Sequence, residues 1–326
     1  MKIYKYLCII SFGQRGVLTI WVNEQSLMKE QNMNAFNLMI YRVIVPKFIR
    51  KRILAYRLPK SILKYYSRLA EKPSSEIQSA LNYLKNNPIA IFPYEFQDEY
   101  IANEVEVFKD EQKGLHYVLL EGRKLYFKKR WGKQKIQNLF NLLSKEQDIR
   151  SPHRYLTEQF NFENGEVLVD VGVAEGNFAL SVVEKASRLI LFEADKEWIE
   201  PLNATFEPWK DKVVIVNKFV SDITNSTNTT IDAIISPGET PMFIKIDVEG
   251  AESRLLKGCK RILSDQKPLK VAVCTYHKQD DEKEFNTLLT QSGFQTSCSE
   301  GFMLFFYDKK MIAPYFRRGL IRAEKK

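Results

Sequence analysis

Short apolar runs alternate with amphipathic segments along the second half of the chain, from Ser151 onward. Continuous runs of Val, Ile, Leu and Phe are typical of parallel strands that are covered by helices on both faces. We therefore predict an α/β fold with a doubly wound sheet. Strands are expected at 166–170, 188–193, 213–220, 242–247 and 270–276, and helices at 177–186, 196–206, 252–263 and 280–291.

The chain ends in two further short apolar segments, 293–297 and 301–307. Only a short turn separates them, which predicts an antiparallel pair, because a parallel pair needs a long crossover. The sheet is therefore expected to finish in an antiparallel hairpin.

The first half of the chain has a mixed, mainly helical pattern. Residues 33–72 predict two amphipathic helices that are broken near Pro59, and a third helix is expected at 76–84. A β-hairpin is predicted at 117–131 and a helix at 134–143. Residues 1–32 have no clear period and are interpreted as a flexible extension. The predicted organisation is thus an extension (1–32), a mixed α+β region (33–150) and the α/β domain (151–326).

The composition is that of a globular protein, with 44% hydrophobic and 27% charged residues. No stretch approaches the roughly 18 apolar residues of a membrane span, and the first residues lack a typical signal-peptide cleavage site. Four cysteines lie far apart and there are only three histidines, which excludes a zinc finger and a disulfide scaffold. This cysteine usage is typical of a reducing cytoplasm.

The net charge of +9 is concentrated in one segment. Residues 42–72, here called the basic segment, contain ten Lys or Arg and one acid, so the rest of the chain is neutral. Localised positive charge points to an acidic partner: an anionic membrane surface, an acidic glycan or nucleic acid. The alternative is that these bases form the solvent-exposed face of a helix and bind no partner. Peripheral contact with the inner face of a membrane is one prediction that follows.

A glycine turn follows the first predicted strand, in which Asp170, Gly172 and Gly176 form the pattern D-x-G-x-x-x-G. Such a turn lets a ligand approach the backbone. Ala174 stands where a tight phosphate loop would need glycine, which favours an adenosyl sulfonium over a dinucleotide. Asp170 would suit the positive amino-acid end of that ligand. Glu193 closes the second strand, where an acid can accept ribose hydroxyls, although NAD uses the same arrangement.

Polar residues also follow the third and fourth predicted strands. Ser221 and Asp222 could bind an adenine edge, although a Ser-Asp pair is also an ordinary turn. Asp247 closes the fourth strand within the string IKIDVEGAE at 244–252. Charges at the end of a buried strand are costly without partners, so we predict a ligand site there. A helix-capping role for Glu249 and Glu252 is the alternative.

Three strings, VDVGVAEGN (169–177), FEAD (192–195) and IKIDVEGAE (244–252), resemble the FkbM family of S-adenosylmethionine-dependent methyltransferases. The resemblance covers about residues 151–308. It implies a seven-stranded class I methyltransferase sheet, Rossmann-like, with an antiparallel last strand, and O-methylation of sugars or other hydroxyl-bearing acceptors. Family members usually show Ala-Asn where this chain has Val173-Ala174. The predicted cofactor-binding residues are Asp170, Gly172, Ala174, Gly176, Glu193, Ser221, Asp222 and Asp247.

His277 follows the fifth predicted strand and should face the same cleft as Asp247. An imidazole with a pKa near 6.5 is a suitable general base for a hydroxyl that must lose its proton. We therefore predict His277 and Asp247 as the catalytic residues. His153 is expected either to line the acceptor side or to pack, and His116 is assigned no role.

Metal chemistry remains an open alternative at this stage. Asp247 with Asp222 or Glu249 could hold Mg²⁺, but no fixed ligand spacing identifies a metal site, so no residue is assigned to one. Cys274 lies within a predicted strand and is expected to be a core residue.

The leading hypothesis is an S-adenosylmethionine-dependent O-methyltransferase that acts on a sugar, glycan or glycolipid-type acceptor. A nucleic-acid methyltransferase is disfavoured, because the fourth strand lacks the Asn/Asp-Pro-Pro-aromatic string of enzymes that methylate base amines. A cofactor-binding module without catalysis and a dehydrogenase are the remaining alternatives. The sequence specifies neither the acceptor nor the oligomeric state.

Overall fold

The computed structural model describes residues 9–11, 17–19, 47–237, 242–308 and 311–325. The chain divides into two compact units, Met1–Leu58 and Pro59–Lys326. In the first unit, β1 (Ile9–Ser11) pairs antiparallel with β2 (Val17–Thr19). Most of the predicted extension 1–32, and everything between 33 and 46, lies outside the described residues.

Helix α2 (Lys47–Tyr66) runs through Pro59 without a break, so the predicted break near this proline is wrong. Proline lacks an N–H group and costs about 3 kcal/mol in a helix interior. Packing on its C-terminal side offsets this cost: Ile62 is fully buried, and the Tyr66 hydroxyl donates to the Pro314 carbonyl (2.7 Å). The predicted helix before residue 47 falls outside the described residues.

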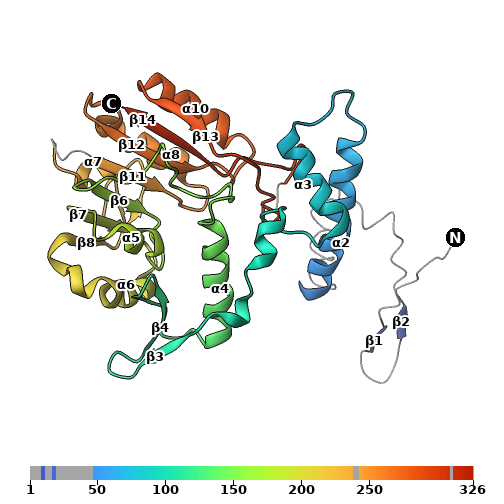
Figure 1. The fold of residues 1–326 in the computed structure, drawn as a ribbon, viewed down its shortest axis with the longest axis horizontal. Coiled ribbons are helices and arrows are strands. Elements are labelled where there is room, and N and C mark those ends of the chain that lie inside the picture. The colour runs from blue at the N-terminus through green and yellow to red at the C-terminus, as the bar shows by residue number, and fades with distance from the viewer. Residues whose placement is uncertain (1–8, 12–16, 20–46, 238–241, 309–310, 326) are drawn as a thin grey trace. The chain divides into compact units, whose positions relative to one another are not determined.

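The centre of the second unit is a seven-stranded sheet in the order β13-β14-β12-β11-β6-β7-β8 (Figure 1). Five neighbouring strands, from β12 to β8, are parallel, whereas β14 is antiparallel to both β12 and β13. The predicted doubly wound sheet is confirmed. The strands are β6 (Val167–Val171), β7 (Arg188–Phe192), β8 (Val213–Val216), β11 (Met242–Ile246), β12 (Leu269–Cys274), β13 (Gln295–Cys298) and β14 (Leu320–Lys325).

Helices cover both faces of this sheet, and alternate residues of each strand pack on opposite faces. Leu168 shares one hydrophobic cluster with α5 and α6, whereas Val169 shares another with α7 to α10. The helices are α5 (Asn177–Val182), α6 (Ile199–Phe206), α7 (Ile231–Ile234), α8 (Glu252–Lys257), α9 (Lys260–Ser264) and α10 (Asp281–Gln291), with 3-10 turns η4 (Lys196–Trp198) and η5 (Glu207–Lys212). Strands buried on both faces explain the continuous apolar runs.

The predicted terminal antiparallel pair is present, but its second strand is β14 and not the segment 301–307. Of that segment, Met303 forms only an isolated bridge to Arg317. The sequence of β14, LIRAEK, looks too polar for a central strand. Its charges are nevertheless satisfied, because Arg322 donates to the Tyr155 carbonyl (3.0 Å) and Lys325 to the Leu263 carbonyl (2.8 Å).

The region before residue 151 packs on the same core as the sheet. Phe127 and Ile136 belong to the hydrophobic cluster that contains Leu168. The predicted hairpin is confirmed as β4–β5, and β3 adds a third strand. The elements are α3 (Ser75–Asn86), η2 (Glu95–Glu99), η3 (Ala102–Glu104), β3 (Phe108–Asp110), β4 (Leu115–Leu120), β5 (Arg123–Tyr126) and α4 (Lys133–Glu146). The boundary at 150/151 stays a prediction.

Candidate functional site

Most of the site residues predicted from the sequence lie where the parallel strands β6, β7, β11 and β12 end. Asp170 is the last residue but one of β6, and Glu193 follows β7. Asp247 follows β11, and His277 lies shortly after β12. Carboxyl ends of parallel strands meet at one edge of the sheet, which is where open α/β folds bind their ligands. The topology therefore brings these four residues to one edge.

The glycine turn after β6 is shaped by close backbone approaches. A Cβ atom at Gly172 (φ 74°) would lie 1.9 Å from the Asp247 carbonyl oxygen, and one at Gly176 (φ 88°) 2.9 Å from the Phe206 ring. Both glycines are therefore required so that the turn can pack against β11 and α6. Ala174 also has a positive φ (47°), and its N–H donates to Glu193 Oε2 (2.9 Å). This bond joins the glycine turn after β6 to the carboxylate that follows β7.

Glu193 is held by two backbone groups and is only half-buried. Its Oε2 accepts from the Ala174 N–H (2.9 Å), and its Oε1 accepts from the Asp195 N–H (2.7 Å). A carboxylate oxygen has a second lone pair, so both oxygens can accept one further hydrogen bond. The structure thus presents a fixed acceptor pair after β7, as a ribose with two hydroxyls requires.

Ser221 and Asp222 follow β9 (Phe219–Val220), which forms a parallel pair with β10 (Asn228–Thr229) outside the main sheet. The predicted strand 213–220 is thus divided into β8 and β9. The Ser221 hydroxyl donates to Asp222 Oδ1 (2.8 Å), and Arg254 Nη2 lies 3.3 Å from the same oxygen. The serine hydroxyl, a backbone N–H and the guanidinium lower the pKa of Asp222.

Asp170 forms a buried ion pair that the sequence did not predict. Its Oδ1 lies 3.0 Å from Lys245 Nζ, which also donates to the Gly172 carbonyl (2.7 Å). Asp170 and Lys245 are 1% and 5% exposed. Burial raises the pKa of Asp170 in spite of this lysine. Asp170 thus ties the glycine turn to β11. A lysine inside an otherwise apolar strand was the signal, because a buried charge requires a partner.

Asp247 is the centre of a cluster of aromatic and imidazole side chains. Tyr155 OH donates to Oδ2 (3.2 Å) and Tyr276 OH to Oδ1 (3.2 Å). His153 Nε2 lies 3.5 Å from Oδ2, and His277 Nε2 lies 3.6 Å from Oδ1. Burial acts to raise the pKa of Asp247, but His153, Lys245 and His277 outweigh it and hold the pKa below its usual range.

His277 is oriented by a buried carboxylate. Its Nδ1 lies 2.9 Å from Glu252 Oε1, and Glu252 is completely buried. The same oxygen accepts from the N–H groups of Val248 (3.0 Å) and Gly250 (3.2 Å). Burial acts to lower the pKa of His277, but the Glu252 hydrogen bond and the nearby carboxylates raise it. The alternative interpretation from the sequence gave Glu252 a helix-capping role alone. Its carboxylate also contacts the His277 ring and fixes the orientation of that ring.

The structure thus brings His277 and His153 close to Asp247, and adds Tyr155, Tyr276 and Glu252 to the cluster. His116 lies in β4, where Lys109 is its strand partner. Cys274 is a fully buried core residue, as expected, and its Sγ contacts His153 Nε2 (3.6 Å).

Comparison with known protein families shows to which family the chain belongs. The model of the methyltransferase FkbM domain matches residues 125–297, about half of the chain. The chain belongs to the FkbM methyltransferase family. This confirms the resemblance seen in the three sequence strings. The matched region begins ahead of the predicted boundary at residue 151, within β5, and includes α4 and all residues of the predicted site.

Three solved structures with some similarity to this FkbM protein bear the names of methyltransferases or methylases. A SAM-dependent methyltransferase from Aquifex aeolicus is 14% identical, with a TM-score of 0.36, covering 60% of this chain and 100% of that chain. The precorrin-6y C5,15-methyltransferase from Geobacter metallireducens is 13% identical (TM-score 0.35; 51% and 84%), and an rRNA methylase from Streptococcus thermophilus is 10% identical (TM-score 0.34; 50% and 88%). Similarity at this level bears on no residue of the site. No curated protein matches the sequence.

The FkbM family uses S-adenosylmethionine, and the donor set at the strand ends fits this cofactor. The acceptor pair of Glu193 suits the ribose. The Ser221 hydroxyl already donates to Asp222 Oδ1, so the Ser221–Asp222 pair offers acceptors, and no side-chain donor, to an adenine edge. The glycine turn has no lysine or arginine that would bind a pyrophosphate. This chemistry matches a nucleoside that carries a sulfonium and no phosphate.

Two further carboxyl groups with raised pKa values, one buried and one partly buried, lie near the FkbM site. Glu175, at the tip of the glycine turn, is 4% exposed, and burial together with nearby Glu146 raises its pKa to about 8. Burial raises the pKa of Glu146, at the end of α4, to about 7, although His153 acts against this rise. Sequence analysis missed both residues, because glutamate is an ordinary residue in a turn or on a helix.

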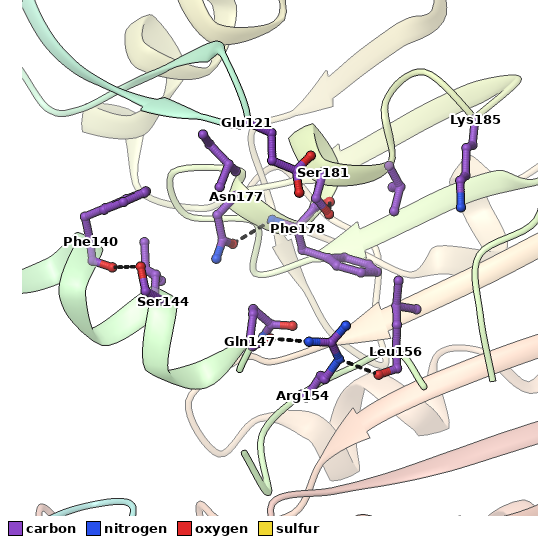
Figure 2. Close-up of a pocket in the computed structure, with 13 residues that line it drawn as sticks. Glu121, Phe140, Ser144, Gln147, Arg154, Leu156, Asn177, Phe178, Ser181 and Lys185 are labelled. Atoms are coloured by element: carbon purple, nitrogen blue, oxygen red, sulfur yellow. Dashed lines mark hydrogen bonds between the residues drawn. The ribbon is translucent and has the colours of Figure 1, made fainter. Parts of the chain in front are cut away.

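A pocket of about 290 Å³ lies beside α5 (Figure 2). It is bounded by α4, α5 and the β4–β5 turn, and none of the predicted site residues lines it. Phe178, which does line it, packs against Tyr155 with 5.0 Å between ring centroids, and Tyr155 donates to Asp247. The lining residues are Leu120, Glu121, Phe140, Leu143, Ser144, Gln147, Arg154, Leu156, Asn177, Phe178, Ser181, Val182 and Lys185.

Proposed function

We propose that this protein transfers the methyl group of S-adenosylmethionine to a hydroxyl group of a sugar, glycan or glycolipid-type acceptor. The observation that carries the proposal is the pair Asp247 and His277 beside the glycine turn. Their facing atoms, Oδ1 and Nε2, are 3.6 Å apart at the edge of the sheet where the cofactor is expected to bind. A hydroxyl that lies beside this pair can donate its proton to one of the two atoms.

Bound S-adenosylmethionine supplies an activated methyl carbon, whose bond to sulfur breaks as the bond to the acceptor oxygen forms. The chain must place the hydroxyl in line with that carbon and receive its proton. Asp247 is suited to the first task, because Tyr155 and Tyr276 hold its carboxylate in one orientation. His277 is suited to the second, because Glu252 occupies its Nδ1 and leaves Nε2 toward Asp247.

The proposed catalytic and cofactor-binding roles are tested with labelled S-adenosylmethionine. The full chain is incubated with oligosaccharides, with lipid-linked sugars and with RNA, and label transfer is measured for each class. Alkali-stable label in the sugar or glycolipid fraction, absent with Asp247→Asn, supports the proposal. Label in RNA alone would show a nucleic-acid methyltransferase. Tight binding of S-adenosylhomocysteine without transfer to any class would favour a binding module.

The basic segment supports a further part of the proposal, which is reversible contact with an anionic membrane surface. Among its described residues, Arg52, Lys60, Lys64, Arg68 and Lys72 are exposed. Each base close to an anionic leaflet contributes about 1 kcal/mol of attraction. None of the helices in the described part of the chain has the length and hydropathy of a membrane span. A glycolipid-type acceptor would be reached from such a surface.

A further inference from the structure

His277 carries an imidazole nitrogen that is buried without a hydrogen-bond partner. The residue is 6% exposed, and its Nε2 has no hydrogen-bond partner among the described residues. Nε2 faces two carboxylates, with Asp247 Oδ1 at 3.6 Å and Glu249 Oε2 at 3.7 Å. A buried polar atom without a partner is rare and calls for an explanation. Here the atom faces the carboxylates of Asp247 and Glu249.

The distances around Nε2 suit a shared metal ion. Ligand atoms that lie about 2.0–2.2 Å from one ion in tetrahedral or octahedral geometry are roughly 3–3.5 Å apart. The observed separation of Nε2 from Asp247 Oδ1 exceeds this by only a few tenths of an ångström. The side chain of Glu249 is 86% exposed and therefore free to rotate toward the same point. We propose that His277 Nε2, Asp247 and Glu249 bind a divalent cation.

Neighbouring side chains already hold these ligands as metal sites require. Metal-ligating histidines usually donate their other N–H to a carboxylate, which fixes the ring and its tautomer. Glu252 Oε1, 2.9 Å from His277 Nδ1, takes this position. Tyr155 and Tyr276 fix the Asp247 carboxylate in the same way.

The charge of the cluster also favours a cation. Asp247, Glu249 and Glu252 bring three carboxylates to one place, while the charge of nearby Lys245 is paired with Asp170 (3.0 Å). A divalent ion would offset the negative charges of Asp247 and Glu249. Asp222, the other carboxylate considered for Mg²⁺, is held by Ser221 and Arg254 instead. A mixed set of imidazole and carboxylate ligands suits Mn²⁺ or Zn²⁺.

The catalytic consequence of this ion rests on the proposed function. A divalent ion with an open coordination position binds the acceptor oxygen and lowers the pKa of its hydroxyl, so that the proton passes to water. With the ion bound, His277 Nε2 is a ligand and no longer the proton acceptor described above, and Glu252 is a positioning residue that acts through it. The ion site itself does not depend on which acceptor is methylated.

The test measures metal binding directly on the full chain, after treatment with a chelator and dialysis. Calorimetric titration with MnCl₂ and with ZnCl₂ should show one site. His277→Ala should weaken binding by roughly 100-fold or more, and Glu252→Gln, which removes only the charge behind the ring, by about 10–100-fold. Asp211→Asn and His116→Gln serve as matched controls, because Asp211 is an exposed carboxylate and His116 lies in β4; both should bind as the parent does.

A second measurement keeps the proposal falsifiable if a variant folds poorly. The chain has only three histidines, so its imidazole proton signals can be assigned with His116→Gln and His153→Gln. Substoichiometric Mn²⁺ should broaden the His277 and His153 signals and leave that of His116 sharp. Equal affinity in His277→Ala, or a sharp His277 signal in the presence of Mn²⁺, would overturn the site.

Binding of S-adenosylhomocysteine is measured on the same samples. If the parent binds it but takes up no ion, the cation site is wrong and the methyltransferase proposal stands. If it binds neither, the proposed function is contradicted as well.

Discussion

Glu175→Gln should stabilise the cofactor-free protein at alkaline pH and leave it nearly unchanged at acidic pH. The Glu175 side chain lies in the glycine turn with only 4% of the residue exposed. Burial, with a smaller effect of nearby Glu146, raises its pKa from 4.5 to about 8. Between these two values the folded protein keeps a proton that the unfolded chain releases. The free energy of unfolding must therefore fall as the pH rises through this window.

The size of the effect follows from the width of that window. Each pH unit changes the free energy of unfolding by about 1.4 kcal/mol, so a shift of roughly 3.5 units corresponds to about 4–5 kcal/mol. The contribution of the protonated carboxyl is fully present below pH 4.5, is lost progressively up to about pH 8 and does not change above it. Glutamine keeps the shape and the hydrogen-bonding capacity of the side chain, but it does not titrate.

Urea unfolding, followed by the fluorescence of the four tryptophans, measures the difference. At pH 5 the two curves should nearly coincide, whereas at pH 8.5 the variant should unfold at a higher urea concentration with an unchanged slope. Glu184→Gln, in an exposed position just after α5, is the matched control and should follow the parent at every pH. If the free energies of unfolding of the variant and the parent differed by the same amount at both pH values, the reasoning that Glu175 is buried with a raised pKa would be refuted.

Three further predictions concern the ligand site and the basic segment. Glu193→Ala should weaken S-adenosylhomocysteine binding in calorimetry by about 1–3 kcal/mol, since it removes a charged hydrogen-bond acceptor. The control Glu197→Ala should bind as the parent does. Equal affinities of Glu193→Ala and the parent would contradict the ribose assignment. His277→Ala should lower methyl transfer to an authentic acceptor by about 10²–10⁴-fold with nearly normal cofactor affinity, and unchanged turnover would leave the residue a packing role. Lys60→Glu with Lys64→Glu should reduce co-sedimentation with anionic vesicles at low salt, by about 1 kcal/mol per base; equal recovery of the parent on neutral and anionic vesicles would exclude membrane attraction.

The ligand edge of the sheet could be located from the sequence, because local patterns specify it. Asp170, Glu193 and Asp247 each end an apolar run, and parallel strands bring such ends to one edge whatever the details of packing. The glycine turn was equally predictable, since Gly172 and Gly176 stand where positive φ angles occur. These inferences needed only the spacing of residues along each strand–turn–helix unit.

Partners across the edge were not predictable in the same way. Asp170 and Lys245 are 75 positions apart. A lysine in an apolar strand indicates that a partner exists, but neither string indicates that the partner is Asp170. Tyr155 reaches Asp247 from a segment ahead of the first parallel strand, 92 positions away. Such contacts depend on the register of neighbouring strands, which is set by packing over the whole sheet.

By itself, the sequence determined the α/β class, the alternation of strands and helices, the glycine turn and the family, because all of these are properties of short continuous segments. Only the tertiary structure decided that α2 continues through Pro59, that β14 is the last strand and that Glu252 orients His277. In each case the local signal was unfavourable or ambiguous: a proline in a helix, a polar string in a sheet, a glutamate at a helix start. Contacts from distant segments, such as Tyr66 on Pro314 and Arg322 on Tyr155, supplied the free energy or the hydrogen bonds that local propensity lacked.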